Sequence, residues 1–313
     1  MAATLTAPFP CFGGKRRAAE LIWSRLGNVP NYVEPFCGSC AVLLARPGGA
    51  GKVETVNDID GLLVNFWRAV KHDPEAVAEY ASWPVTELDL LARHDWLIGK
   101  RESITAMLRD DPDAYDAKAA GWWCWGANTW IGSGFGFQAA DQIPHLGDAG
   151  RGVNRRLPHL GDAGRGVNRR LPHLGDAGTG VTDWMYGLAE RLRHVRIISG
   201  EWQRTCTPSV TTKHGITGVV LDPPYDAEGH DRSMYVAYGS VAKEVGAWCR
   251  ENGGNPLFRI ALCGYEGEHD LPGWTCEPWK ARKGYGSDAN TRRERIWFSP
   301  HCLSASLFDM GGY

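Results

Sequence analysis

The sequence predicts an α/β fold, with a doubly wound, Rossmann-like sheet, an antiparallel C-terminal strand pair and an inserted, mostly helical region. Three observations predict this fold. Short apolar segments rich in β-branched residues alternate with amphipathic helical segments near the start of the chain. A second group of such segments follows a long helical and glycine-rich interval. Two apolar segments near the end could pair as neighbouring antiparallel strands.

The first part of the chain alternates helices and strands. Its helices have apolar residues at helical spacing, and its strands are short and end at Pro, Gly or Asp. In order, we expect a helix at Arg16–Leu26, a strand at Asn31–Pro35, a helix from Cys40, a strand at Lys52–Val56 and a helix at Gly61–Lys71.

The rest of the chain completes the sheet after an insertion. We expect one helix at each of Pro74–Trp96, Ala114–Ile131, Asp183–His194 and Val241–Cys249, and strands at Arg196–Ser199, Thr217–Leu221 and Leu257–Cys263. We also expect an antiparallel pair formed by Trp274–Trp279 and Arg295–Ser299. These elements predict one sheet domain made of residues 1–74 and 183–313. Residues 75–182 form the inserted region.

A 14-residue tandem repeat occupies residues 144–181 of the insertion. Pro144–Leu157 reads PHLGDAGRGVNRRL, Pro158–Leu171 is identical, and a third copy departs at Thr179. Two interpretations stay open: a duplication tolerated in a surface loop, or a basic, glycine-rich arm that contacts phosphates. The arginines that would make those contacts are Arg151, Arg155, Arg156, Arg165, Arg169 and Arg170.

Composition limits the class of protein. The 313 residues include 34 Lys and Arg and 36 Asp and Glu, a net charge of −2, which argues against coating nucleic acid by bulk charge but allows a local basic cleft. No apolar run reaches the roughly 18 residues of a membrane span, and the first residues lack the features of a signal peptide. Nine cysteines, an odd number, predict reduced thiols in the core of a cytoplasmic protein.

The most specific motif is Asp222-Pro223-Pro224-Tyr225, directly after an apolar strand. Ligands of open α/β sheets bind beyond the carboxyl ends of the strands. Two prolines remove two N–H donors, so their carbonyls and the Asp222 carboxylate present acceptors only. Such a pocket suits an exocyclic amino group, and the ring of Tyr225 could stack on a base.

A second motif joins a strand, a glycine turn and a helix start in the string YVEPFCGSC, from Tyr32 to Cys40. The turn would let the backbone approach a nucleoside closely. It lacks G-x-G-x-x-G, so a nicotinamide dinucleotide is not favoured. The pair Cys37 and Cys40 has no second pair and no histidine pair at ligand spacing, so we expect no metal.

Two weaker signals flank this motif. Asp58 or Asp60, after the second strand, could bind ribose hydroxyls, and one of them could instead cap the following helix. The string FGGKR around Lys15 is not a phosphate-binding loop, because the required first glycine and the Ser or Thr are missing. We expect it to place one cation, with a carboxylate as its partner.

Together and in this order, these motifs resemble the Dam-type DNA adenine methyltransferases, especially their phage-borne members. The matching strings are PFPCFGGK from Pro8, VEPFCGS from Val33, NDI from Asn57 and DPPY from Asp222, with RERIWFSP from Arg293 also similar. The resemblance covers about residues 8–75 and 195–300. It implies transfer of a methyl group from S-adenosylmethionine to adenine N6 in DNA, and target recognition by the insertion.

The resemblance also implies roles for residues. Contacts to the methyl donor would come from Cys11, Phe12, Lys15, Glu34, Phe36, Gly38, Asp58 and Asp222. The family usually has an aromatic residue where Cys11 stands. Glu201 and Trp202 could flank the donor's adenine. The target base would leave the stack, rest on Tyr225 and donate its amino hydrogens to Asp222 and the Pro223 carbonyl, within the Asp222-Pro223-Pro224-Tyr225 pocket.

Several alternatives stay open. The tryptophans between Trp122 and Trp130 could form a helical core or a wedge against bases. The activity could instead be cytosine-N4 methylation, methylation of RNA or of a protein side-chain amide, or DNA binding without catalysis. We expect DNA as the partner, no membrane, a monomer or weak dimer, and, for a phage-encoded protein, the cytoplasm of a bacterial host, where restriction could be evaded.

Overall fold

The computed structural model describes residues 5–11, 14–130, 135–136, 180–225, 241–279 and 293–304. Two compact units are present. The helical unit comprises Met1–Phe12, Asp58–Arg193 and Asp231–Val236, and the sheet unit comprises Gly13–Asn57, His194–His230 and Ala237–Tyr313. Most of the repeat, including its six arginines, lies outside the described residues, so its two interpretations stay predictions.

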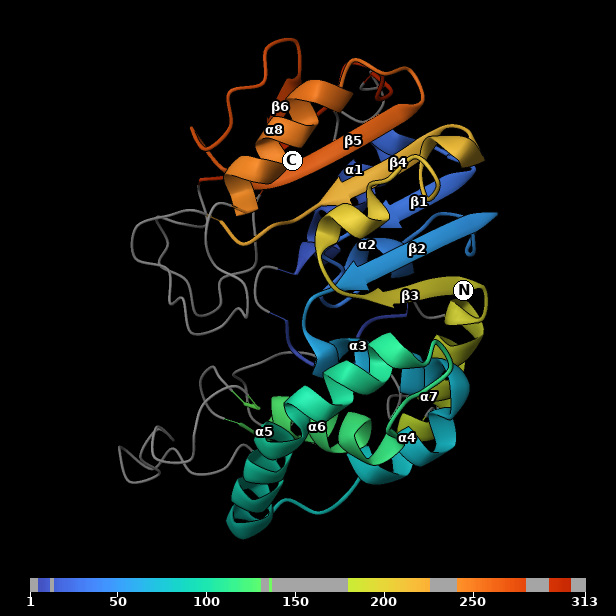
Figure 1. The fold of residues 1–313 in the computed structure, drawn as a ribbon, viewed down its shortest axis with the longest axis vertical. Helices are drawn as coiled ribbons and strands as arrows, with labels where there is room; N and C mark the ends of the chain where they lie inside the picture. The colour runs from blue at the N-terminus through green and yellow to red at the C-terminus, as the bar shows by residue number, and fades with distance from the viewer. Residues whose placement is uncertain are drawn as a thin grey trace. The chain divides into compact units, whose positions relative to one another are not determined.

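A seven-stranded mixed sheet forms the sheet unit (Figure 1). Strands β1, β2, β4 and β5 run parallel, whereas β7 is antiparallel to both β5 and β6. The spatial order is β3-β2-β1-β4-β5-β7-β6. The strands are β1 (Asn31–Glu34), β2 (Val53–Asp58), β3 (Val195–Ser199), β4 (Thr217–Leu221), β5 (Phe258–Tyr265), β6 (Thr275–Pro278) and β7 (Glu294–Phe298). The predicted α/β class and the antiparallel closing pair are confirmed.

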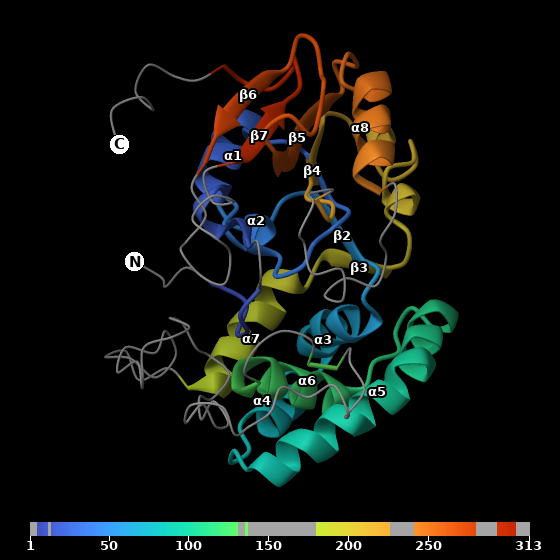
Figure 2. The same cartoon turned by 90° about the vertical axis from the view of Figure 1, so that its left-hand side faces the viewer.

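Helices cover both faces of this sheet (Figure 2). On one face lie α1 (Ala19–Leu26) and α2 (Ala41–Leu44), and on the other lies α8 (Val241–Asn252). The core on the α8 face is apolar and includes Val33, Val219 and Leu262. Because side chains alternate along a strand, Tyr32 points to the opposite face, where it stacks on Trp23 with ring centroids 4.9 Å apart.

Five helices form most of the helical unit: α3 (Gly61–His72), α4 (Pro74–Ala81), α5 (Glu87–Asp110), α6 (Ala117–Thr129) and α7 (Val181–Leu192). An aromatic cluster lies in its core. The ring of Phe9 is 5.2 Å from that of Phe66 and 4.8 Å from that of Trp123, both in edge-on geometry. Edge-on aromatic pairs add stability beyond the area they bury.

The tryptophans of α6 belong to this core. Trp123, Trp125 and Trp130 are buried, and the Arg93 guanidinium lies 4.1 Å from the Trp125 ring centroid. Arg93 is itself buried, so the cation–π contact compensates in part for lost hydration. The core interpretation of these three tryptophans is therefore confirmed.

Two sequence predictions are wrong in detail. Residues Pro74–Trp96 do not form one helix, because helix α4 ends at Ala81 and helix α5 begins at Glu87 with Thr86 as its N-cap. Pro84 favours this break, since proline disfavours helical geometry in the residue before it. The cysteines are not all in the core, because Cys11 and Cys276 are exposed and Cys302 is only partly buried.

Within the described ranges, no helix combines the length and the apolar character required to cross a membrane.

Candidate functional site at the carboxyl ends of the strands

Strand register places several polar side chains on one face of the sheet, at its carboxyl edge. Leu221 pairs with Leu262, so Asp222 follows next to Cys263. Tyr265 pairs with Glu294 on the antiparallel strand β7. Alternation along the strands puts these side chains on the same face as Tyr32 and Glu34, the face that α1 covers.

Lys15 and Asp222 form the central ion pair of this edge. The Lys15 Nζ lies 2.7 Å from Asp222 Oδ1, and the lysine side chain is only 5% exposed. Burial alone would lower the pKa of Lys15, but the coulombic attraction of the Asp222 and Glu294 carboxyl groups outweighs it and raises the pKa. The lysine is therefore charged, and the carboxylate partner expected for it is Asp222.

Tyr225 connects this ion pair to a second carboxylate. Its hydroxyl lies 3.1 Å from Asp222 Oδ1 and 3.1 Å from Glu294 Oε2. The Tyr225 ring packs edge-on against Tyr265 at 4.7 Å, and Lys15 Nζ lies 5.2 Å from its centroid. These contacts fix the orientation of a ring that is still partly exposed.

Glu294 is a carboxyl group of this cluster with a raised pKa. Burial and the neighbouring Asp222 charge raise its pKa to about 7, although Lys15 and the hydrogen bond from Tyr225 act in the opposite direction. Burial also raises the pKa values of Tyr225 and of the Cys263 thiol well above their usual range. The hydroxyl and the thiol are therefore neutral near pH 7.

The glycine turn after β1 is tied to the neighbouring strand ends by Asn57. The Asn57 Nδ2 donates to the carbonyls of Pro35 and Gly200, both at 2.9 Å, and the main-chain carbonyl of Asn57 accepts from Cys37 N at 2.9 Å. Gly38 has φ of 44°, a left-handed conformation that glycine adopts without strain. The turn is thus held in a fixed shape beside the end of β1.

The acceptors at this edge fit a positively charged methyl donor. Glu34 is buried and accepts a hydrogen bond from Tyr32 at 2.9 Å. Asn57 Oδ1 is buried and has no hydrogen-bond partner among the described residues. Buried acceptors require donors, and the ammonium and hydroxyl groups of S-adenosylmethionine would supply them.

Asp58 and Asp60, in the helical unit, have different roles. Asp60 Oδ1 caps α3 by accepting from Leu62 N at 3.0 Å, and it pairs with Arg101 at 2.7 Å. Asp58 ends β2, and its Oδ1 accepts from Asp60 N at 3.1 Å. The capping role that the sequence leaves open therefore belongs to Asp60.

The other sequence-predicted residues are placed as follows. Pro223 is buried and Pro224 and Phe36 are partly buried at the sheet edge. Trp202 lies in the core of the α8 face, 6.1 Å from the ring of Phe36, whereas Glu201 is exposed. Cys11 is exposed in the helical unit, and Phe12 lies outside the described residues.

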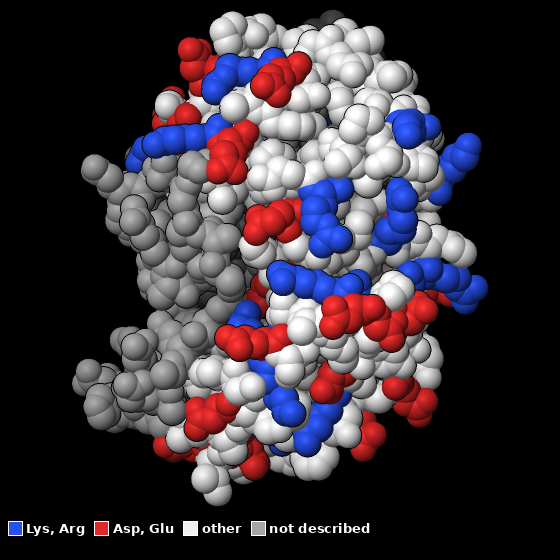
Figure 3. Space-filling view, viewed as in Figure 1, with Lys and Arg blue, Asp and Glu red and all other residues white. Residues whose placement is uncertain are grey.

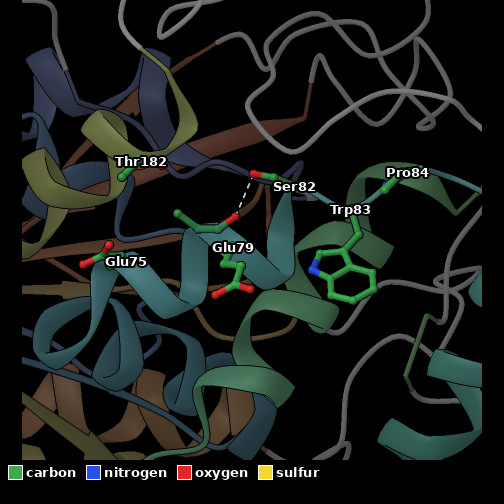
Figure 4. A pocket seen from close by; sticks show the side chains of 7 residues that line it. Glu75, Glu79, Ser82, Trp83, Pro84 and Thr182 are labelled. Atoms are coloured by element: carbon green, nitrogen blue, oxygen red, sulfur yellow. Dashed lines mark hydrogen bonds between the residues drawn. The ribbon is translucent and has the colours of Figure 1, made fainter.

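The charged surface and the pocket of the helical unit point less clearly to a ligand than the carboxyl edge of the sheet does. The face in Figure 3 carries interspersed acidic and basic side chains on its described part. The helical unit has an open pocket of about 530 Å³ lined by Glu75, Ala78, Glu79, Ser82, Trp83, Pro84 and Thr182 (Figure 4). Its two glutamates would repel phosphate, so it does not suit a nucleic-acid backbone.

Glu294, Tyr265 and Cys263 lie in no sequence motif that predicts a role for them. Cys263 and Tyr265 reach the site through the parallel pairing of β5 with β4, and Glu294 reaches it through the antiparallel pairing of β7 with β5. One signal could have identified Glu294: it is an acidic residue at the start of an apolar strand that must begin at the carboxyl edge of the sheet.

The fold and this edge define a class of protein. The sheet has seven strands, is mostly parallel and ends in an antiparallel strand pair, with a glycine turn after β1 and an acidic residue after β4. This arrangement is consistent with a Rossmann-like methyltransferase. The family model described as D12 class N6 adenine-specific DNA methyltransferase matches residues 12–95. Over this segment, which is less than half of the chain, the protein is similar to a family of S-adenosylmethionine-dependent DNA methyltransferases. In the comparison with curated proteins, none matches the chain.

Proposed function

We propose that the protein methylates the exocyclic N6 of adenine in DNA at the Asp222-Pro223-Pro224-Tyr225 pocket. The observation that supports this proposal best is the cluster of Lys15, Asp222 and Tyr225 at the carboxyl edge. Asp222 and Tyr225 lie beyond the residues matched by the family model. A buried lysine holds the Asp222 carboxylate as an acceptor, and the hydroxyl contact fixes the tyrosine ring beside it. An amino group needs that acceptor, and a flipped base needs a stacking surface.

Bound S-adenosylmethionine would supply an electrophilic methyl group on a sulfonium. Its contacts, in this proposal, come from Cys11, Phe12, Lys15, Glu34, Phe36, Gly38, Asp58 and Asp222. Asp222 and the Pro223 carbonyl orient the target amine, so that its lone pair is directed at the methyl group. Catalysis of this kind depends on positioning and electrostatics, for which a preorganised ion pair is suited.

Transfer of label tests the substrate class. Purified protein would be incubated with methyl-labelled S-adenosylmethionine and either unmethylated genomic DNA or total RNA. We expect label in DNA at a rate well above that in RNA. Label in RNA alone, or self-labelling of protein without transfer to DNA, would overturn the proposal. A protein that binds DNA but transfers no label would be an inactive DNA-binding relative.

The aspartates at the end of β2 offer a matched pair of variants. Asp58→Ala should weaken binding of S-adenosylmethionine while changing stability little, because Asp58 does not cap α3. Asp60→Ala removes the cap and the Arg101 partner, and should lower the free energy of unfolding by about 1–2 kcal/mol. Calorimetric titration and urea unfolding of both variants measure the two effects. Equal loss of donor affinity in both variants would contradict the assignment.

In this proposal, residues 75–182 recognise the target sequence. The contacts to the phosphates of the DNA backbone come from Arg151, Arg155, Arg156, Arg165, Arg169 and Arg170. Deleting Pro158–Leu171 removes one copy of the repeat with its three arginines. Each lost phosphate contact should lower the magnitude of the slope of the logarithm of the binding constant against the logarithm of the salt concentration by about one. Binding measured across a salt series checks this. Unchanged affinity and slope would leave the repeat as a tolerated duplication.

The cellular setting is part of the same proposal. A phage-encoded enzyme of this kind would act in the cytoplasm of a bacterial host and could protect phage DNA from restriction. To test it, phage would be propagated in a host that expresses the enzyme and then used to infect a host that carries a restriction enzyme. Protection is expected with the active enzyme and not with Asp222→Ala.

A further inference from the structure

The Tyr225 hydroxyl lies between two carboxyl groups. Asp222 Oδ1 and Glu294 Oε2 are each 3.1 Å from its oxygen. A phenol has one hydrogen, and two ionised carboxylates are acceptors only. The one hydrogen can be shared weakly between both carboxylates, but two full hydrogen bonds form at once only when one carboxyl carries a proton. The three groups therefore form a chain that can hold one exchangeable proton.

Charged and titratable groups from several elements surround Glu294. Lys15 precedes α1, Asp222 and Tyr225 follow β4, and Cys263 and Tyr265 lie on β5. Glu268, after β5, adds a second negative charge. Lys15 neutralises Asp222 directly, at 2.7 Å. Glu294 is buried, and its pKa of about 7 makes it the carboxyl that accepts or releases a proton near neutrality.

The proposed methyl transfer leaves one proton to be removed. The N6 lone pair forms the new N–C bond, the S–C bond breaks with its electrons left on sulfur, and the methylated amine is then cationic. Asp222 is the acceptor closest to this nitrogen in the proposed pocket. A proton left on Asp222 would break its pairing with Lys15, so a further acceptor is required.

We propose that Glu294 is a positioning residue that takes up this proton through Tyr225. Asp222 accepts the proton from the amine and passes it to the Tyr225 oxygen, while the Tyr225 hydroxyl hydrogen moves to Glu294. The amine loses one proton, Glu294 gains one, and Asp222 and Tyr225 return to their starting states. This inference rests on the proposed function, because it needs the amine at Asp222.

The pH dependence of single-turnover methylation tests the relay. Glu294 must be ionised to accept a proton, so the wild-type rate should rise with pH through about 7 and then level off. Glu294→Gln and Tyr225→Phe should both lose this rise and be slowed about 100-fold above pH 7, the lower end of what positioned proton transfer contributes. Tyr225→Phe keeps the ring for stacking. Glu266→Gln, an exposed carboxylate paired with Arg295, is the matched control and should keep the wild-type profile.

A second readout requires neither donor nor DNA. Infrared titration of the protein alone should show one carboxyl band with a midpoint near pH 7, absent in Glu294→Gln and present in Glu266→Gln. The glutamine variant avoids a buried charge, so it should unfold at a temperature no lower than wild type at pH 8. A misfolded Glu294→Gln protein would have a lower unfolding temperature than wild type, and Tyr225→Phe would then be the variant that tests the relay.

The outcomes separate the two proposals. Activity retained in Asp222→Ala overturns the pocket itself and the relay with it. Activity lost in Asp222→Ala, but a wild-type pH profile in Glu294→Gln and Tyr225→Phe, overturns the relay alone. A flat profile in Tyr225→Phe together with a missing carboxyl band in Glu294→Gln supports both.

Discussion

Asp222→Ala should lower the rate of methyl transfer at least about 1,000-fold, because it removes the acceptor that would orient the target amine. The carboxylate is held 2.7 Å from the buried Lys15 and contacts the Tyr225 hydroxyl. Its loss therefore affects both the amine contact and the position of the ring. Single-turnover assays with saturating donor and DNA measure the effect on chemistry apart from binding. Wild-type activity in this variant would refute the site.

A control for Asp222→Ala must separate its effect on chemistry from its effect on stability through Lys15. Without Asp222, the Lys15 ammonium stays buried without its ion pair, which destabilises the fold. Lys15→Met combined with Asp222→Asn removes both charges and should recover stability relative to Asp222→Ala. The double variant should still be inactive. Recovery of stability without recovery of activity separates a chemical role from a folding role.

Arg46→Met should lower the free energy of unfolding by about 3–5 kcal/mol, because it breaks a buried ion pair. Arg46 Nη1 lies 3.1 Å from Glu54 Oε1 on β2, and both side chains are almost fully buried. The guanidinium also lies 4.9 Å from the Trp23 ring centroid and donates to the Val29 carbonyl. Denaturant unfolding followed by tryptophan fluorescence measures the shift in midpoint, with an unchanged m-value required for its interpretation.

A matched substitution at the surface shows whether burial causes this effect. Arg193 pairs with Glu190 at 2.8 Å, but both side chains are more than half exposed. Arg193→Met should therefore cost about 0.5 kcal/mol or less. Similar losses for both variants would contradict the importance of the buried pair.

Much of the fold could be predicted because its signals are local. The strand Thr217–Leu221 is observed with the predicted bounds, and the closing antiparallel pair is observed near its predicted positions. The sheet order and the break after Ala81 depend on more than local periodicity. Pro84 and the Thr86 cap separate α4 from α5, whereas apolar spacing alone predicts a continuous helix.

The site could be predicted in part for the same reason. Lys15, Asp222 and Tyr225 lie in short motifs, and the structure brings them into contact. Glu294 is distant from them in the chain and reaches Tyr225 only through the pairing of β7 with β5. Its perturbed pKa comes from burial, which periodicity does not reveal. Asp58 and Asp60 could be separated only by observing which carboxylate caps α3.

Identification of the methylated nucleoside tests the central claim most directly. DNA treated with the wild-type protein and S-adenosylmethionine would be digested to nucleosides and analysed by mass spectrometry, with Asp222→Ala as the blank. The acceptor pocket at Asp222 predicts a methylated exocyclic amino group, and the similarity of residues 12–95 to N6 adenine-specific enzymes predicts that the product is N6-methyldeoxyadenosine. N4-methyldeoxycytidine would instead move the activity to cytosine, and methylated nucleosides at equal levels with Asp222→Ala would contradict the account of this site.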